Sequence, residues 1–220
     1  MSESWVRERG QAAVDTVVFD IGGVLIDWNP RYLYRRLFND EVAMEKFLAE
    51  VCNTEWNERQ DAGRDWSEAI HALCGKFPQQ ASLIHAYRNR WEEMLGGPLH
   101  ETVAILDELR ASGTRLYALT NWSADTFEIA RQRYGFLHWF EDIVVSGRER
   151  LIKPDAALFH RLLTRNDIDP ARAVYIDDTR RHVDAANALG MHGLVFRDAP
   201  TLRRELSSLG LLASPTMVVS

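Results

Sequence analysis

The apolar positions of the chain follow two different patterns on either side of a Gly-Gly-Pro break at residues 96–98. After the break, short apolar runs alternate with segments whose apolar residues recur at helical spacing. The runs predict strands at 115–120, 143–145, 173–177 and 193–196, and the segments predict helices at 100–112, 123–134, 156–166 and 180–189. Repeated alternation of this kind is typical of an α/β fold, with a parallel sheet covered by helices on both faces.

Before the break the pattern is mostly helical. One further strand is expected at 15–20, where a short apolar run precedes an aspartate. From about Pro30 to Leu95 no convincing strand is visible, and apolar residues recur at helical spacing in four segments. We therefore expect residues 1–28 and 97–220 to form one α/β core domain, and residues 29–96 to form a small helical domain inserted into it.

Composition narrows the class of protein. The 220 residues are 46% hydrophobic, which suffices for a packed core, and the net charge of −6 disfavours a nucleic-acid binder. No stretch approaches the roughly 20 apolar residues of a membrane helix, and Met1–Gln11 does not resemble a signal peptide. Cys52 and Cys74 lack metal-ligand spacing and are expected to be buried free thiols. We expect a cytoplasmic monomer or homodimer, without a nucleic-acid or membrane partner.

Polar residues stand where three of the predicted strands end, and a lysine follows a short loop between the second and the third. In chain order they are Asp20 with Gly22, Thr120 with Asn121, Lys153, and Asp177 with Asp178. Ligands of open α/β sheets bind outside the carboxyl ends of the strands. A carboxylate at the position of Asp20 could act there as a nucleophile or as a metal ligand.

Each of these residues also has a purely structural interpretation. Asp20 could cap a backbone amide in a turn, and Thr120 with Asn121 could form a helix N-cap. A lysine before proline, such as Lys153, is usually a solvated surface residue. Asp177 and Asp178 could cap the helix that follows them, but adjacent carboxylates repel each other, so a bound cation explains the pair better.

Taken in this order, the four segments resemble the motifs of the haloacid dehalogenase (HAD) superfamily of hydrolases, and the resemblance covers nearly the whole chain. It implies a Rossmann-like parallel sheet with a helical cap inserted after the first motif. It also implies that Asp20 is the nucleophile, which forms an aspartyl-phosphate or aspartyl-ester intermediate. Lys153 would neutralise Asp20 and the incoming phosphate, while the Thr120 hydroxyl and the Asn121 backbone N–H would bind phosphate oxygens.

The same resemblance implies a Mg²⁺ site, because hard oxygen ligands suit that ion. Asp20, Asp178 and a backbone carbonyl near Gly22 would hold it, and Asp177 would be a further ligand or would orient a water. Dehalogenases of this superfamily have serine and asparagine at the fourth motif and need no metal. Asp177 and Asp178 match the phosphatase pattern instead.

Gly22 departs from most phosphatases of the superfamily, which carry a second aspartate two positions after the nucleophile. That aspartate protonates the leaving group and later activates water, a contribution of roughly 10² to 10⁴-fold. Its absence leaves three explanations. The substrate could have a good leaving group, such as a sugar 1-phosphate; another group, such as His182 or a residue of the inserted helices, could supply the proton; or the protein could be a slow hydrolase.

Residues 175–183 are similar to the bacterial branch that includes alpha-D-glucose-1-phosphate phosphatase, and to the phosphatase half of soluble epoxide hydrolase, although both usually have asparagine at the position of His182. The first of these also has glycine at the position of Gly22. We predict a Mg²⁺-dependent phosphatase of a small phosphorylated metabolite, with a sugar phosphate as one candidate. The alternatives are a metal-independent 2-haloacid dehalogenase and a catalytically weak protein that binds a phosphometabolite.

A polar segment of the inserted domain is a candidate for the substrate pocket. We interpret it as a turn between two helices, and it contains Trp56, Glu58, Arg59, Asp61 and Gly63. These residues could stack on and hydrogen-bond a hydroxylated substrate, although a solvated helix connection explains the segment equally well. Trp28, just after the first motif, is a further candidate to face the cleft.

Overall fold

The computed structural model describes residues 13–213, and its centre is a sheet of five parallel strands. Their spatial order is β5 (Asp142–Val145), β4 (Arg115–Thr120), β1 (Thr16–Phe19), β6 (Ala173–Asp177) and β7 (His192–Val195). Each lies within about two residues of a strand predicted from the apolar runs. The α/β class is confirmed.

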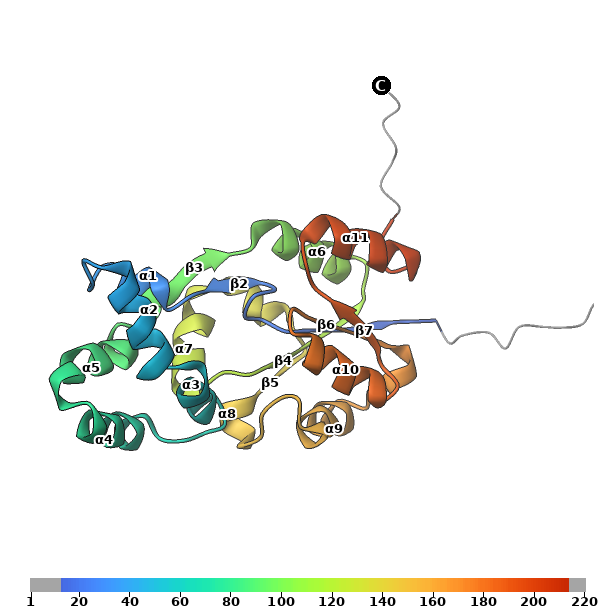
Figure 1. Ribbon diagram of the computed structural model, residues 1–220. Coiled ribbons are helices and arrows are strands. Elements are labelled where there is room, and N and C mark those ends of the chain that lie inside the picture. The colour runs from blue at the N-terminus through green and yellow to red at the C-terminus, as the bar shows by residue number, and fades with distance from the viewer. Residues whose placement is uncertain (1–12, 214–220) are drawn as a thin grey trace, which may run out of the picture.

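Helices cover both faces of this sheet because its side chains alternate between two hydrophobic clusters. Val17 and Phe19 of β1 belong to one cluster, and Val18 belongs to the other. The first cluster is covered by α6 (His100–Ala111), α7 (Ala124–Arg133) and α11 (Ala199–Ser208), and the second by α9 (Ala156–Arg165) and α10 (Arg180–Ala188). Figure 1 shows α6 with α11 on one side of the sheet and α9 with α10 on the other. The short helix α8 (Ser146–Glu149) and α11 were not predicted.

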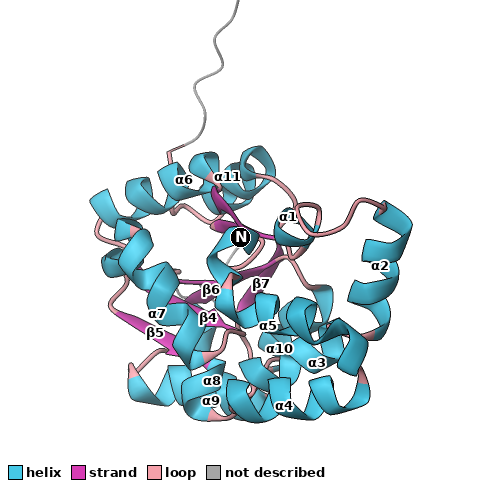
Figure 2. Ribbon diagram, turned by 90° about the vertical axis from the view of Figure 1, so that its left-hand side faces the viewer, coloured by secondary structure: helices cyan, strands magenta, loops and turns pink. Residues whose placement is uncertain are grey.

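Five α-helices lie between the first strand and α6, in the segment that the sequence predicts to be helical. They are α1 (Arg31–Tyr34), α2 (Glu41–Glu50), α3 (Thr54–Asp61), α4 (Trp66–Lys76) and α5 (Ala81–Asn89), and we call them the inserted helices. Short 3₁₀ turns occur at Pro78–Gln80, Trp91–Met94, Gly135–Trp139 and Pro170–Arg172. Figure 2 shows the inserted helices beside the ends of the sheet strands.

Two details of this region differ from the prediction. Most of the polar segment expected to be a turn lies in helix α3, whose N-cap is Asn53. The Asn53 side chain accepts a hydrogen bond from Trp56 N. The Gly-Gly-Pro break is part of strand β3 (Leu95–Pro98), which pairs antiparallel with β2 (Ile26–Trp28). This two-stranded ribbon is where the chain leaves the sheet and returns to it, so the inserted helices start and end beside the first motif.

The inserted helices pack through the same hydrophobic cluster that covers one face of the sheet, for example through Phe47 and Trp56. The division into a core of residues 1–28 and 97–220 and a cap of residues 29–96 stays a prediction. Of the two cysteines expected to be buried, Cys52 is buried and Cys74 is partly exposed. No helix within residues 13–213 is long and apolar enough to cross a membrane, and Met1–Gln11 lies outside the described residues.

Candidate active site

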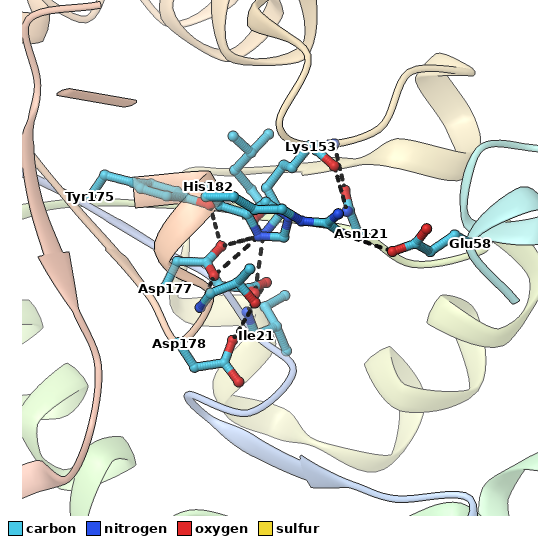
Figure 3. Close-up of polar contacts among 12 residues, drawn as sticks. Ile21, Glu58, Asn121, Lys153, Tyr175, Asp177, Asp178 and His182 are labelled. Carbon is cyan, nitrogen blue, oxygen red and sulfur yellow. Dashed lines mark hydrogen bonds and ion pairs between the residues drawn. The ribbon is translucent and has the colours of Figure 1, made fainter. Parts of the chain in front are cut away.

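The predicted motif residues meet at the carboxyl ends of β1, β4 and β6, which are neighbours in the sheet. Because parallel strands all end at the same edge, residues far apart in sequence are brought together there. Asp20, Gly22, Thr120, Asn121 and Asp178 line one cavity of about 240 Å³. Lys153 and Asp177 lie beneath it, fully buried. Figure 3 shows polar contacts around Asn121, Lys153, Asp177 and Asp178.

Asp20 is held at the end of β1 by its backbone and its side chain. Its N–H donates to Ile176 O at 2.7 Å, and its Oδ1 accepts from Ile21 N at 2.7 Å. Its Oδ2 lies 3.0 Å from Lys153 Nζ. Burial raises the pKa of Asp20 above its ordinary value and the Asp177 charge adds to this, while Lys153 opposes it. Both oxygens are therefore oriented, and the carboxylate faces the cavity.

Lys153 is not the solvated residue that its sequence context suggests. Its Nζ donates to Asp177 Oδ2 at 2.7 Å and to Leu119 O at 3.0 Å, in addition to the contact with Asp20. Burial alone would lower the pKa of Lys153, but Asp20 and Asp177 raise it above its ordinary value. The ammonium group thus stays charged beside Asp20.

Asn121 positions the loop that carries Lys153, a role that the motif did not predict. Its Oδ1 accepts from Lys153 N at 2.8 Å, and its Nδ2 donates to Lys153 O at 3.2 Å. Neither Thr120 nor Asn121 caps α7, whose N-cap is Ser123. Thr120 is 1% exposed and lines the cavity.

Asp177 has partners at both of its carboxylate oxygens. Besides Lys153, it accepts hydrogen bonds from Tyr175 Oη at 2.5 Å and from Thr179 N at 2.8 Å, and His182 Nδ1 lies 3.1 Å away. Burial alone would raise its pKa, but Lys153 and His182 hold the pKa of Asp177 well below its usual range. Because Thr179 is at the start of α10, this hydrogen bond agrees in part with the interpretation that Asp177 caps the following helix.

These contacts bear on the prediction that Asp177 is a metal ligand. Asp20, Asp177 and His182 can bring one ligand atom each within 4.8 Å of one another. Lys153 Nζ nevertheless contacts both carboxylates and takes the place that a cation would need between them. We therefore interpret Asp177 as the residue that positions Lys153, and its role as a further metal ligand stays a prediction.

Asp178 is exposed and lines the cavity, unlike its neighbour Asp177. Desolvation and the charge of Asp177 raise the pKa of Asp178. Its carboxylate leans against Gly23, where a Cβ would lie 2.3 Å from Asp178 Oδ2, and Gly23 has a φ of +73°. Only glycine leaves room for this carboxylate. Asp178, Asp20 and the main chain at Gly22 offer hard oxygen donors around one cavity, a set that fits Mg²⁺.

Helix α3 and segments outside the inserted helices complete the lining of the cavity. Its walls include Trp28, Asn57, Asp61, Trp91 and Trp122. Trp28 and Asp61 were candidates from the sequence, whereas the other three were missed. Asn57 lies one helical turn before Asp61, a spacing that would have revealed it if the segment had been recognised as a helix.

The remaining candidates of the polar segment do not line this cavity. Trp56 packs edge-on against Trp66 and Tyr87, and Arg59 pairs with Glu55. Glu58 pairs with Arg181 of α10 at 2.8 Å. Gly63 lines a separate pocket.

Asp61 is the acidic group that the inserted helices contribute. Its Oδ2 accepts from Asn57 Nδ2 at 2.9 Å, and its main-chain oxygen accepts from Ser146 Oγ at 2.5 Å. Burial raises the pKa of Asp61 to about 7. A hydrogen bond from the backbone N–H of Ser123 lowers this pKa, and the charge of Glu58 adds to the rise. A carboxyl group that exchanges its proton near neutral pH therefore lines the cavity.

Comparisons with known proteins agree with this geometry. The family model described as haloacid dehalogenase-like hydrolase matches residues 14–190. Sesquiterpene phosphatase astK of Aspergillus oryzae is 30% identical over 193 residues, which cover 87% of this chain and 94% of that protein.

Two solved structures share the fold. A predicted HAD-like family hydrolase from Porphyromonas gingivalis has a TM-score of 0.68 at 22% identity, covering 89% of this chain and 98% of that one. The HAD family enzyme bt-2542 from Bacteroides thetaiotaomicron, in complex with magnesium and inorganic phosphate, has a TM-score of 0.62 at 18% identity. That likeness covers 84% of this chain and 94% of that enzyme.

Proposed function

Because this chain belongs to the haloacid dehalogenase-like hydrolases, we propose that it is a Mg²⁺-dependent phosphatase of a small phosphorylated metabolite. One observation carries the proposal: Asp20, Thr120 and Asp178 line the same cavity, and Lys153 contacts Asp20 from below. A nucleophile, a hydroxyl donor, a free acid and a buried cation are the groups that phosphoryl transfer needs.

The reaction begins at Asp20, whose carboxylate attacks phosphorus and forms an aspartyl phosphate. Covalent catalysis splits one difficult displacement into two easier ones. The fixed positive charge of Lys153 offsets the repulsion between Asp20 and a phosphate dianion. The Thr120 hydroxyl and the Asn121 backbone N–H bind phosphate oxygens and orient the phosphorus toward Asp20.

Asp20, Asp178 and a carbonyl near Gly22 would hold the Mg²⁺ ion. The bound ion would supply positive charge to the phosphate oxygens. Asp178 forms no ion pair among the described residues and lines the same cavity as Asp20, so it is the carboxylate that a cation would neutralise. This arrangement disfavours the dehalogenase alternative, which needs no metal.

The walls of the cavity bear on the substrate. Three indole rings line it, and none of its lining residues within 13–213 is an arginine or a lysine. Such walls favour a substrate with one phosphate group attached to an uncharged organic group. Indoles can stack on a sugar ring while Asn57 and Asp61 bind its hydroxyls, so a sugar phosphate remains one class to test. The relative that is a sesquiterpene phosphatase supports an isoprenoid monophosphate as the other. A closer kinship to the glucose-1-phosphate phosphatase branch stays a prediction.

Phosphate release from a broad panel of monophosphates, with and without Mg²⁺, tests this function. We expect turnover that stops with EDTA and returns with excess Mg²⁺, and no halide release from 2-chloropropionate. Asp20→Asn, which keeps the shape of the side chain, should lose at least about 10²-fold in rate. Halide release in EDTA, or binding of phosphorylated ligands without turnover, would support one of the two alternatives instead.

A further inference from the structure

The structure offers a source for the proton that Gly22 does not supply. An alcohol leaves a phosphate ester as an alkoxide unless it is protonated, so an acid must lie beside the leaving oxygen. The lining of the cavity, within residues 13–213, contains no histidine, tyrosine or cysteine, and its titratable groups are Asp20, Asp61 and Asp178. Asp20 and Asp178 have roles at the phosphate, which leaves Asp61.

His182, the other candidate from the sequence, has a ring nitrogen within 4.8 Å of an Asp20 carboxylate oxygen but lies outside the cavity. Its side chain is buried beside Asp177, which its Nδ1 contacts at 3.1 Å, and it is not part of the cavity lining. Lys153 intervenes between this pair and Asp20. A proton on His182 therefore has no direct path to the leaving oxygen.

Asp61 is fixed in place by a contact with the end of β5 and by a contact within its own helix, α3. Ser146 Oγ, at the end of β5, donates to its main-chain oxygen, and Asn57 donates to its carboxylate. Helix α3 is tied to α10 by the Arg181–Glu58 ion pair. Asp61 thus lines the cavity from α3, whereas Asp20, Thr120 and Asp178 line it from the sheet edge, so the organic part of a substrate bound through its phosphate would lie beside α3.

Resting on the proposed phosphatase function, we propose that Asp61 is the general acid and base that replaces the carboxylate missing at Gly22. As Asp20 Oδ bonds to phosphorus, the bond from phosphorus to the leaving oxygen breaks, and the Asp61 proton moves to that oxygen. The products are a neutral alcohol, the aspartyl phosphate and an Asp61 carboxylate. That carboxylate then takes a proton from a water that attacks phosphorus, which frees phosphate and restores both aspartates.

The surroundings of Asp61 suit both halves of this cycle. Burial raises its pKa to about 7, so the acid and the carboxylate are both populated near neutral pH. The groups that act on it are the Ser123 N–H, which favours the carboxylate, and Glu58, which favours the acid; Tyr87 is a further titratable neighbour. The Asn57 amide hydrogen-bonds the carboxylate and orients it.

The decisive experiment compares leaving groups in Asp61→Asn. The quantity is kcat/KM, which reports the steps up to transfer onto Asp20, for p-nitrophenyl phosphate and for the best alkyl phosphate of the panel. p-Nitrophenolate leaves without a proton, whereas an alkoxide does not. We expect Asp61→Asn to lose at least about tenfold more on the alkyl phosphate. Glu55→Gln, an exposed acid on the same helix, is the matched control and should leave the ratio unchanged.

Two further readouts separate catalysis from a structural role. Adding Gly22→Asp to Asp61→Asn should restore at least part of the alkyl activity, because a Cβ at Gly22 meets no atom within 4 Å. The fall of alkyl kcat/KM above about pH 7 in the wild type should vanish in Asp61→Asn. If Asp61→Asn does not fold, Asp61→Ser provides the same comparison.

Equal losses on both substrates would overturn the role of Asp61 as an acid and leave it as a residue that binds substrate. The proposed phosphatase function would then still stand, because wild-type turnover of p-nitrophenyl phosphate with Mg²⁺ tests that function separately. Absence of that turnover would contradict the phosphatase function and the role of Asp61 together.

Discussion

Lys153 Nζ lies 2.7 Å from Asp177 Oδ2, and both side chains are completely shielded from solvent. An ion pair at this depth leaves a costly unpaired charge when either partner is removed. Asp177 has only hydrogen-bonding groups and His182 as its other partners. The same ion pair therefore stabilises the fold and holds the Lys153 ammonium group beside Asp20.

Replacing Lys153 by methionine should destabilise the fold as well as abolish turnover. Asp177 would remain buried without its cation, which typically costs about 3–5 kcal/mol. Urea unfolding of Lys153→Met measures the change in the free energy of unfolding. Lys46→Met, at an exposed position, is the control and should change it by less than about 0.5 kcal/mol. Equal stability of the two variants would show that the buried pair carries no such energy.

Asp178→Ala should weaken Mg²⁺ binding, with partial recovery of turnover at high Mg²⁺. The variant loses one hard oxygen ligand but keeps the nucleophile. Titration calorimetry with Mg²⁺ measures the affinity directly, and Asp184→Ala, on α10 in an ion pair with Arg180, is the control. Unchanged affinity in Asp178→Ala would remove this residue from the ligand set.

Gly23→Ala should impair Mg²⁺ binding much more than Gly22→Ala does. A methyl group at Gly23 would lie 2.3 Å from Asp178 Oδ2 and would strain a backbone with φ of +73°. At Gly22 the same methyl group meets nothing within 4 Å. The Mg²⁺ dissociation constants of the two variants provide the comparison, and similar values would mean that Asp178 does not depend on the space at Gly23.

Asp61→Asn should become more stable than the wild type as pH rises. The pKa of Asp61 is raised from 3.8 to about 7 in the folded protein, so its favourable contribution is complete below about pH 4 and is lost as pH rises through 7. Asparagine resembles the protonated acid at every pH. The urea midpoints of the two proteins, measured between pH 4 and pH 8, should therefore diverge with increasing pH. A difference in urea midpoint that stays constant between pH 4 and pH 8 would indicate that burial does not raise the pKa of Asp61.

The sequence predicts the sheet and its functional edge well, because both follow from local patterns. Short apolar runs that end in Asp20, Thr120 and Asp177 determine where parallel strands present their polar residues. The family resemblance then assigns them chemistry. That resemblance extends to Lys153, but not to its burial, which depends on partners supplied by β1, β4 and β6.

The parts that the sequence does not predict depend on contacts between distant segments. Helix α3 has few apolar residues, so it has no clear period, and its identity depends on Asn53 as N-cap and on Trp56 packing against Trp66. Strand β3 contains Gly-Gly-Pro, which normally indicates a turn, and becomes a strand only by pairing with β2. Without a helix at α3, nothing distinguishes Asp61, which faces the cavity, from Glu58, which faces Arg181.

The central claim is that Asp20 carries the phosphoryl group, and chemical trapping tests it most directly. Acid quenching during turnover followed by borohydride reduction converts an aspartyl phosphate to homoserine, which peptide mass spectrometry locates. We expect homoserine at position 20 in the wild type with substrate and Mg²⁺, and none without substrate or in Asp20→Asn. Steady turnover with no homoserine at position 20, or with homoserine at another aspartate, would contradict the account.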